Sequence, residues 1–75
     1  MASIKVKFGR AVRKLREDAD YSQESFADAI GVHRTYMGTV ERGRGNPTLD
    51  MIGKIARGLK VSLKQLFEAV ENESG

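Results

Sequence analysis

Two short helical patterns joined by the segment 31–33 constrain the fold of this chain more than any other feature. The earlier pattern covers about residues 23–30 and is followed by Gly31, which suits the left-handed residue that closes a helix. The later pattern covers about residues 34–42 and is followed by Gly43 in the same role. Its apolar residues recur every three to four positions, as on one face of a helix: Val32, Tyr36, Met37 and Val40. The sequence therefore predicts two short helices joined by a tight turn that contains glycine.

Capping residues mark where the later helices begin. Ser22, Thr48 and Ser62 can each accept a hydrogen bond from a free backbone N–H group of the first helical turn. Gln65 is placed to complete a capping box with Ser62. His33 stands at the start of the helix predicted over 34–42, although histidine is a poor substitute for serine or threonine at that position.

The remaining segments also favour helices. An apolar stripe predicts a helix over about 4–19: Ile4, Phe8, Val12 and Leu15. The alternation of Ile4, Val6 and Phe8 is also typical of a short strand, but the stripe continues past Phe8 and favours a helix.

Two more helices complete the predicted fold. One runs from Leu49 to Arg57 or Leu59, and the last runs from Leu63 to Val70, followed by a polar tail over 71–75. We therefore predict an all-α fold, a compact five-helix domain without strands that spans residues 1–75.

Composition excludes several classes of protein. The 75 residues contain no Cys and a single His, so neither a disulfide nor a metal site is expected. No apolar run approaches the ~18–20 residues of a membrane span, and the first residues lack the apolar core of a signal peptide. We expect a cytoplasmic protein that contacts no membrane and needs no cofactor or small-molecule ligand.

Charges are segregated along the chain although the net charge is only +3. Residues 1–16 contain six basic residues and no acid, and residues 17–28 contain five acids and no base. Residues 33–64 contain seven basic residues against Glu41 and Asp50. This division predicts a basic side suited to phosphate and an acidic side that faces away from it, against the plainer interpretation of a mixed polar surface.

The non-apolar face of the helix predicted over 34–42 carries Arg34, Thr35, Gly38, Thr39 and Arg42. Such a short helix, with Arg and Thr side chains facing outward, fits the major groove of DNA. The alternative is an ordinary solvated helix face.

Taken together, several segments of the chain resemble the phage repressor/Cro-type helix-turn-helix family, also called the xenobiotic-response-element family. The resemblance covers most of the chain from Phe8 to Phe67, with the two-helix motif at about 22–42. It rests on these segments: Tyr21–Ala27, Gly31-Val32, Arg34–Met37, Val40–Gly43, Asn46–Leu49 and Val61–Phe67. Within the family, the residues Arg34-Thr35-Tyr36 and Glu41-Arg42 are also similar to the controller proteins of restriction–modification systems.

The resemblance implies a transcriptional regulator that binds double-stranded DNA as a homodimer at a near-palindromic site. The residues it places at base edges are Arg34, Thr35 and Thr39. Those it places near the DNA backbone are Gln23, His33, Tyr36, Arg42, Arg44 and Asn46. Two alternatives stay open here, because the Tyr36 ring could belong to the core and His33 could be a cap only.

The resemblance also implies two structural roles. Arg16 and Glu41 would form a pair that joins the first helix to the end of the third. The last helix would form the dimer contact, and the alternative is that it only closes the monomer. Its expected contact residues are Leu63, Leu66, Phe67 and Val70.

Two positions depart from the family pattern, Lys60 and His33, and Gly38 is unusual for its place in a helix. The family usually has Gly where Lys60 stands, so either the helix ends irregularly near Gly58 or Lys60 adopts a positive φ. His33 replaces the usual Ser or Thr. Gly38 lies inside the proposed DNA-reading helix, where glycine costs roughly 0.5–1 kcal/mol relative to alanine, and a close approach to the backbone would explain it.

Other classes of protein fit the sequence less well. An enzyme is not expected, since the lone His33 has no Ser and acid pattern around it and segment 43–45 lacks the phosphate-loop spacing. The main alternative is an antitoxin-like regulator whose principal role is to bind a partner protein.

Overall fold

The computed structural model describes residues 2–74, and both Met1 and Gly75 at the end of the predicted tail lie outside the described residues. The described residues form helices and no strand, as predicted. The helices are α1 (Ile4–Asp18), α2 (Gln23–Ile30), α3 (Arg34–Glu41), α4 (Leu49–Leu59) and α5 (Leu63–Glu71).

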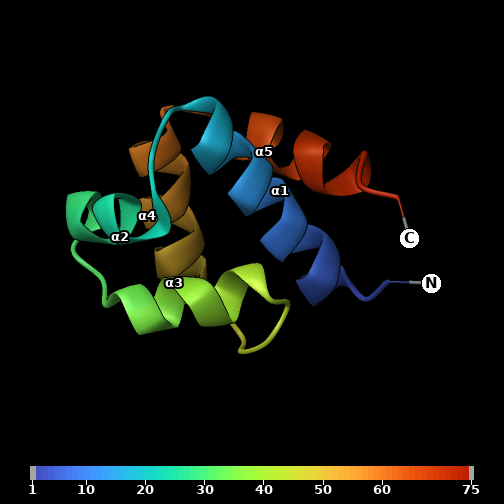
Figure 1. The fold of residues 1–75 in the computed structure, drawn as a ribbon. Coiled ribbons are helices and arrows are strands. Elements are labelled where there is room, and N and C mark those ends of the chain that lie inside the picture. The colour runs from blue at the N-terminus through green and yellow to red at the C-terminus, as the bar shows by residue number, and fades with distance from the viewer. Residues whose placement is uncertain (1, 75) are drawn as a thin grey trace.

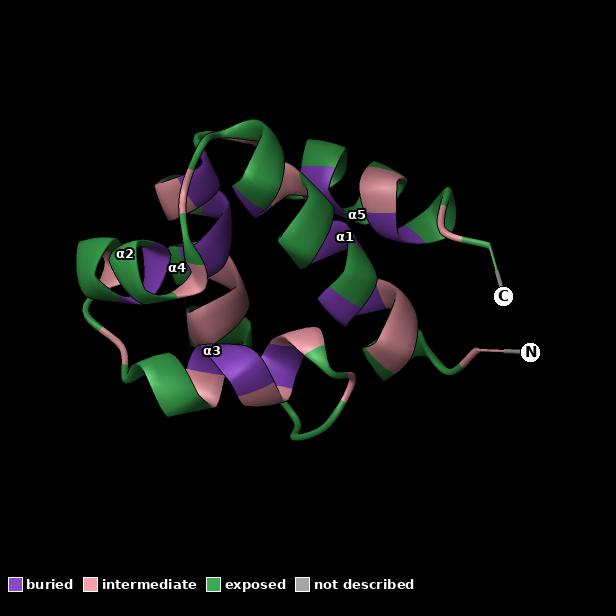
Figure 2. Ribbon diagram, viewed as in Figure 1, coloured by how far each residue is buried: buried purple, intermediate pink, exposed green. Residues whose placement is uncertain are grey.

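Helix α1 is the centre of the arrangement. It packs against α5, α3 and α4, whereas α2 packs against α3 and α4. In Figure 1, α3 forms the lower edge of the molecule, α2 lies at one side, and the two chain ends lie together at the other. The buried surfaces of all five helices face a common interior (Figure 2).

The interior is apolar apart from the paired side chains of Arg16 and Glu41. The buried hydrophobic residues are Phe8, Ala11, Val12, Phe26, Ala27, Met37, Val40, Ile55, Ala56, Leu59, Leu66 and Val70. Because every helix contributes to this cluster, none of them packs independently, and the orientation of α3 depends on the whole domain.

Local signals explain where the helices begin. Ser3 accepts a hydrogen bond from the Val6 N–H group at 3.2 Å and caps α1, which settles the first turn as helix and not strand. Ser62 and Gln65 form the predicted capping box at α5, with Ser62 N–H donating to Gln65 Oε1 at 2.8 Å. Thr48 caps α4 as predicted by accepting from the Met51 N–H group at 3.1 Å.

Lys60 ends α4 in the left-handed conformation, with φ 60° and ψ 38°. Of the two alternatives for this departure, the positive φ is therefore the correct one. Gly58 has a different role, because a Cβ atom there would collide with Ile30 and press on the Phe26 ring. The glycine lets α2 and α4 approach each other, and the helix continues past it to Leu59.

Candidate nucleic-acid interface

The two-helix motif forms through caps at both helix starts. Ser22 Oγ accepts from the Ser25 N–H group at 3.0 Å, and Ser25 Oγ accepts from the Ser22 N–H group at 2.9 Å. Gly31 then closes α2 in the left-handed region with φ 74°. His33 caps α3, since its Nδ1 atom accepts from the Thr35 N–H group at 3.2 Å. The short connection holds α2 directly against α3.

Helix α3 is buried on one side and open on the other. Met37 and Val40 are buried in the core, whereas Arg34 and Thr35 are exposed. The exposed side chains therefore project from a helix whose inner face is fixed by packing, which is the arrangement that insertion into a groove requires.

Two candidate residues on α3 are more covered than the helix start. Thr39 is half-buried, and its hydroxyl donates to the Thr35 carbonyl oxygen at 3.0 Å. Its methyl group lies beside Gly45 of the following loop. Tyr36 is also half-buried and packs partly against the core cluster.

The segment after α3 turns through two glycines with positive φ, Gly43 and Gly45, both at 76°. A Cβ atom on Gly43 would collide with Val6 of α1, so the loop is packed closely against that helix. The loop leaves Arg44 and Asn46 exposed, next to the exposed Arg42 at the end of α3. Three of the candidate backbone-contacting side chains therefore reach solvent from one short segment.

A buried ion pair joins α1 to the motif, as the sequence implied. Arg16 Nε donates to Glu41 Oε2 at 2.7 Å, and Arg16 Nη2 donates to Glu41 Oε1 at 2.9 Å. Arg16 Nη1 also donates to the Tyr21 carbonyl oxygen at 2.8 Å. The hydrogen bond to Glu41 is the main cause that raises the pKa of Arg16, against the opposing effect of burial.

Gln23 joins the same network. Its Nε2 atom donates to Glu41 Oε1 at 3.1 Å, so this candidate DNA-contacting residue is turned toward the protein interior. A Cβ atom on Gly38 would lie 3.2 Å from Gln23 Oε1 and 3.1 Å from Arg42 Nη1. Both atoms are the far ends of flexible side chains, so they would need to move only a few tenths of an ångström to admit a Cβ atom in the middle of α3.

Glu24 corrects the expectation that the acidic segment faces away from the basic one. Arg34 Nη1 donates to Glu24 Oε2 at 2.6 Å, and both side chains are exposed. Glu24 was not among the residues predicted to belong to the site. The sequence held one signal for Glu24, which is its position in the first turn of α2, two residues after the cap Ser22. Because α3 begins close to that turn, a side chain there can reach the start of α3.

Leu66 and Val70 correct the expected dimer contact. Both are 0% exposed within the monomer, so neither has surface to offer a second copy. The apolar side chains of α5 that remain exposed are Leu63 at 53% and Phe67 at 38%. Two further exposed residues were not predicted as contacts, Ile4 at 64% and Leu49 at 85%.

Neither a cluster of metal-ligating side chains nor a membrane-spanning helix is found in the part of the chain that the structure describes. Residues 2–74 contain no group of three or more His, Cys, Asp or Glu side chains placed to hold a metal ion. Over the same residues, no helix combines the length and the apolar character needed to cross a bilayer.

Comparison with known proteins places the chain in a class. The helix-turn-helix family matches residues 12–66. The chain therefore belongs to the helix-turn-helix family, and it is a DNA-binding transcriptional regulator. The family is one of transcription regulators and not of enzymes.

Its similarity to individual members extends over nearly the whole chain. Control protein C.MunI of Mycoplasma sp is 45% identical over 74 residues, which are 97% of this chain and 100% of that protein. Control protein C.BamHI of Bacillus amyloliquefaciens is 40% identical over 67 residues, covering 88% of this chain and 83% of that protein. The crystal structure of the restriction-modification controller protein C.AhdI from Aeromonas hydrophila matches with a TM-score of 0.79 at 44% identity, covering 83% of this chain and 94% of that chain.

Proposed function

We propose that this chain is a controller protein of a restriction–modification system that binds a near-palindromic operator as a homodimer. The observation that carries the proposal is the exposed start of α3, where Arg34 and Thr35 project from a helix whose opposite face is buried. The similarity to C.MunI over the full length of that protein and to the controller C.AhdI supports the same regulatory system. A cytoplasmic location is consistent with this role.

In the proposed complex, α3 lies in the major groove. Arg34 can donate two hydrogen bonds to guanine, and Thr35 offers a hydroxyl group and a methyl group to thymine. The Thr39 hydroxyl already donates to a backbone carbonyl, so toward a base it can only accept a hydrogen bond or offer its methyl group.

Contacts to the DNA backbone would hold this helix in register. Arg42, Arg44 and Asn46 are exposed on the segment that leaves α3, at the edge of the proposed groove contact. His33 uses Nδ1 to cap α3, which leaves Nε2 as the ring nitrogen that can donate to a phosphate oxygen. Gln23 and the half-buried Tyr36 could reach phosphate at the edges of the same surface, Gln23 by leaving Glu41.

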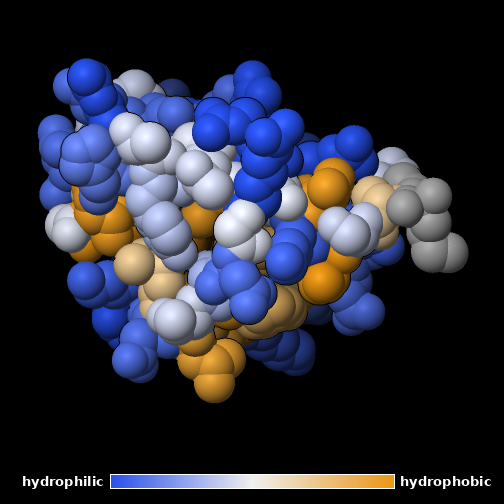
Figure 3. Space-filling model, turned by 90° about the horizontal axis from the view of Figure 1, so that it is seen from below, coloured by the Kyte–Doolittle hydropathy of each residue, from blue (hydrophilic) through white to orange (hydrophobic). Residues whose placement is uncertain are grey.

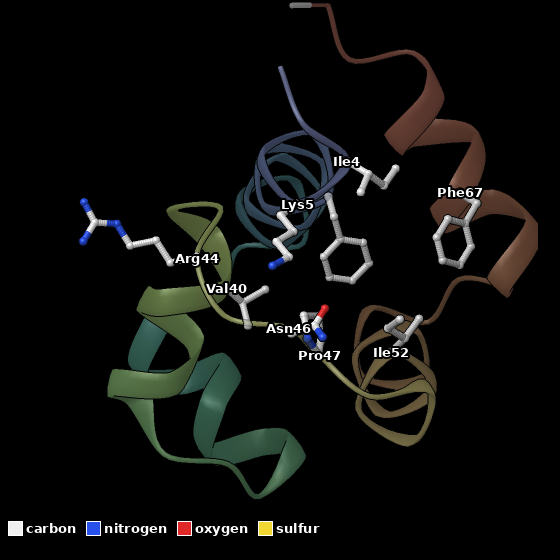
Figure 4. Close-up of a pocket in the computed structure, with 9 residues that line it drawn as sticks. Ile4, Lys5, Val40, Arg44, Asn46, Pro47, Ile52 and Phe67 are labelled. Atoms are coloured by element: carbon white, nitrogen blue, oxygen red, sulfur yellow. The ribbon is translucent and has the colours of Figure 1, made fainter. Parts of the chain in front are cut away.

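The proposed dimer contact is an apolar hollow between the start of α1, the 44–47 loop, α4 and α5. The hollow has a volume of about 150 Å³, and Figure 4 shows Ile4, Ile52 and Phe67 around it. Lys5 and Asn46 are polar residues at the hollow, whereas the Arg44 side chain extends away from it. Seen from below, one group of apolar side chains lies near the chain ends and others lie at the left and lower edges of a face that is otherwise largely polar (Figure 3). Phe67 lies one helical turn after Leu63, and Ile52 lies one turn after Leu49, so the exposed residues of α4 and α5 extend this apolar surface.

A second copy of the chain is the proposed occupant of this surface. Contact across a two-fold axis would remove four exposed apolar side chains per protomer from water: Ile4, Leu49, Leu63 and Phe67. The same symmetry would set two α3 helices about 34 Å apart, which is one turn of B-DNA, and would select a near-palindromic sequence.

A footprint on the DNA upstream of the gene tests the proposal. We expect protection of two half-sites related by a two-fold axis, weakening steeply as salt is raised because phosphate contacts release counterions. Protection that is absent at low salt, or that is uniform along the fragment without preferred sites, would contradict the proposed function.

A further inference from the structure

Glu24 brings a negative charge to the surface that is proposed to meet DNA. A shallow hollow between the start of α2 and α3 is lined by Ser22, Gln23, Glu24, Arg34, Thr35, Gly38 and Arg42. Glu24 is the one acid among these lining residues, which include two arginines that are candidates for DNA contact, Arg34 and Arg42. A carboxylate here repels the DNA backbone, so its presence calls for an explanation in terms of what it does to Arg34.

The ion pair occupies only part of the Arg34 guanidinium. One nitrogen, Nη1, donates to Glu24 Oε2 at 2.6 Å. Arginine has five N–H donors in a planar fork, so Nη2 and Nε keep donors for another partner. The exposed pair therefore favours one direction of the guanidinium without using up its capacity to bind.

The neighbouring carboxylate treats the two possible partners of Arg34 differently. A phosphate group that binds Arg34 is an anion within a few ångströms of the Glu24 carboxylate, and the two negative charges repel each other. The O6 and N7 atoms of guanine are neutral acceptors and carry no such penalty. Glu24 thus disfavours phosphate at Arg34 and leaves guanine as the better partner.

We propose that Glu24 is a positioning residue that makes Arg34 read bases instead of gripping phosphate, an inference that rests on the proposed α3–DNA contact. The purely structural alternative is that Glu24 only stabilises α2, because its negative charge lies near the positive N-terminal end of the helix dipole. That alternative predicts a change in thermal stability when the charge is removed and no change in base preference.

The test uses the full chain and duplexes with a random central sequence, from which each variant selects its preferred sites. The variants are Glu24→Gln, Arg34→Ala and the double variant. The matched control is Asp18→Asn, which removes one negative charge from the exposed end of α1, where no ion pair to Asp18 is found among the described residues. A mixed-sequence duplex supplies the salt dependence of non-specific binding.

We expect Glu24→Gln to weaken selection at the same base position that Arg34→Ala weakens. On the mixed-sequence duplex, the slope of log affinity against log salt should steepen by about 0.9 per protomer, because Arg34 then contacts one more DNA phosphate group. In the Arg34→Ala background, Glu24→Gln should change neither quantity, and Asp18→Asn should leave both at the wild-type value.

Two results would overturn the inference. One is full selection at the Arg34-dependent position in Glu24→Gln, whatever happens to its stability. The other is an equal change of slope in Asp18→Asn, which would indicate a general effect of net charge. If the wild-type chain selects no sequence at all, the proposed function itself fails, so the two failures are distinguishable.

Discussion

Arg16 in α1 and Glu41 at the end of α3 form a bidentate ion pair that is almost completely buried, with side-chain exposures of 8% and 3%. Both members also bind the start of the motif, Arg16 through the Tyr21 carbonyl oxygen and Glu41 through the Gln23 amide. The pair therefore fixes α3 relative to both α1 and α2, and it sets the direction in which the exposed face of α3 points.

Removing one member of this pair should destabilise the domain strongly. Arg16→Ala or Glu41→Ala leaves the charge of the partner buried without its ion pair, and we expect the free energy of unfolding to fall by ~3–5 kcal/mol. Arg13→Ala is the control, because the Arg13–Glu17 pair is exposed and should contribute less than ~1 kcal/mol. Urea denaturation followed by circular dichroism measures both, and equal losses in the two variants would contradict a special role for the buried pair.

The stability that the Arg16 charge provides should not vary near neutral pH. A raised pKa in the folded state gives stability that is complete below the pKa of the unfolded chain and is lost only above the folded value. For an arginine both values lie far above neutrality.

Two glycines should respond differently to alanine. A Cβ atom on Gly9 would collide with the Val40 and Glu41 carbonyl oxygens, which are backbone atoms that cannot move without separating α1 from α3. Gly9→Ala should therefore lose ~1–3 kcal/mol of stability. At Gly38 the nearest atoms are the flexible ends of Gln23 and Arg42, so Gly38→Ala should cost much less or even stabilise α3. Thermal unfolding of the two variants measures both changes in stability. A larger loss of stability in Gly38→Ala than in Gly9→Ala would contradict this explanation.

Lys60→Gly should stabilise the domain. Lys60 holds φ at 60°, a conformation that costs a side-chain-bearing residue roughly 1–2 kcal/mol and glycine almost nothing. Part of that gain is offset by the greater freedom of glycine in the unfolded chain, so we expect a net gain of about 1 kcal/mol or less. The melting temperature should rise accordingly, whereas Lys64→Gly, inside α5, should lower it.

Arg34→Ala and Arg44→Ala should separate base recognition from backbone contact. If Arg34 contacts guanine, its loss should weaken operator binding by ~1–3 kcal/mol and relax the choice of base at one position in each half-site. Loss of Arg44 should weaken binding to all sequences alike and reduce the salt slope by about 0.9 per protomer. Titration of operator and mutated operator duplexes measures both effects, and unchanged site preference in Arg34→Ala would defeat its assignment.

Phe67→Asp should convert the proposed dimer into a folded monomer, because it places a charge in the apolar contact. Leu49→Asp should act in the same way, since Leu49 belongs to the exposed apolar residues of α4. Ala29→Asp serves as the control, because Ala29 is exposed on α2, which does not line the hollow. Sedimentation reports the mass of each variant, and an intact dimer in Phe67→Asp would reject this contact surface.

Much of the fold could be predicted because its signals are local. Caps such as Ser22 and Thr48 act within one helical turn, and Gly31 satisfies a single φ requirement, so a few neighbouring residues decide each boundary. The apolar periodicity then separates the buried face of α3 from its exposed face. These signals, together with the family resemblance, were sufficient for the helix-turn-helix motif and for the exposure of Arg34 and Thr35.

The tertiary structure decided what each face meets. Periodicity placed Leu66 on the apolar side of α5, but only the packing of α5 on α1 shows that it is covered within the monomer while Phe67 is not. In the same way, the sequence located Glu24 among the acids, and only the crossing of α2 and α3 brings it to Arg34. Helix propensity and capping depend on residues a few positions apart, whereas these contacts join residues that only the folded chain brings together.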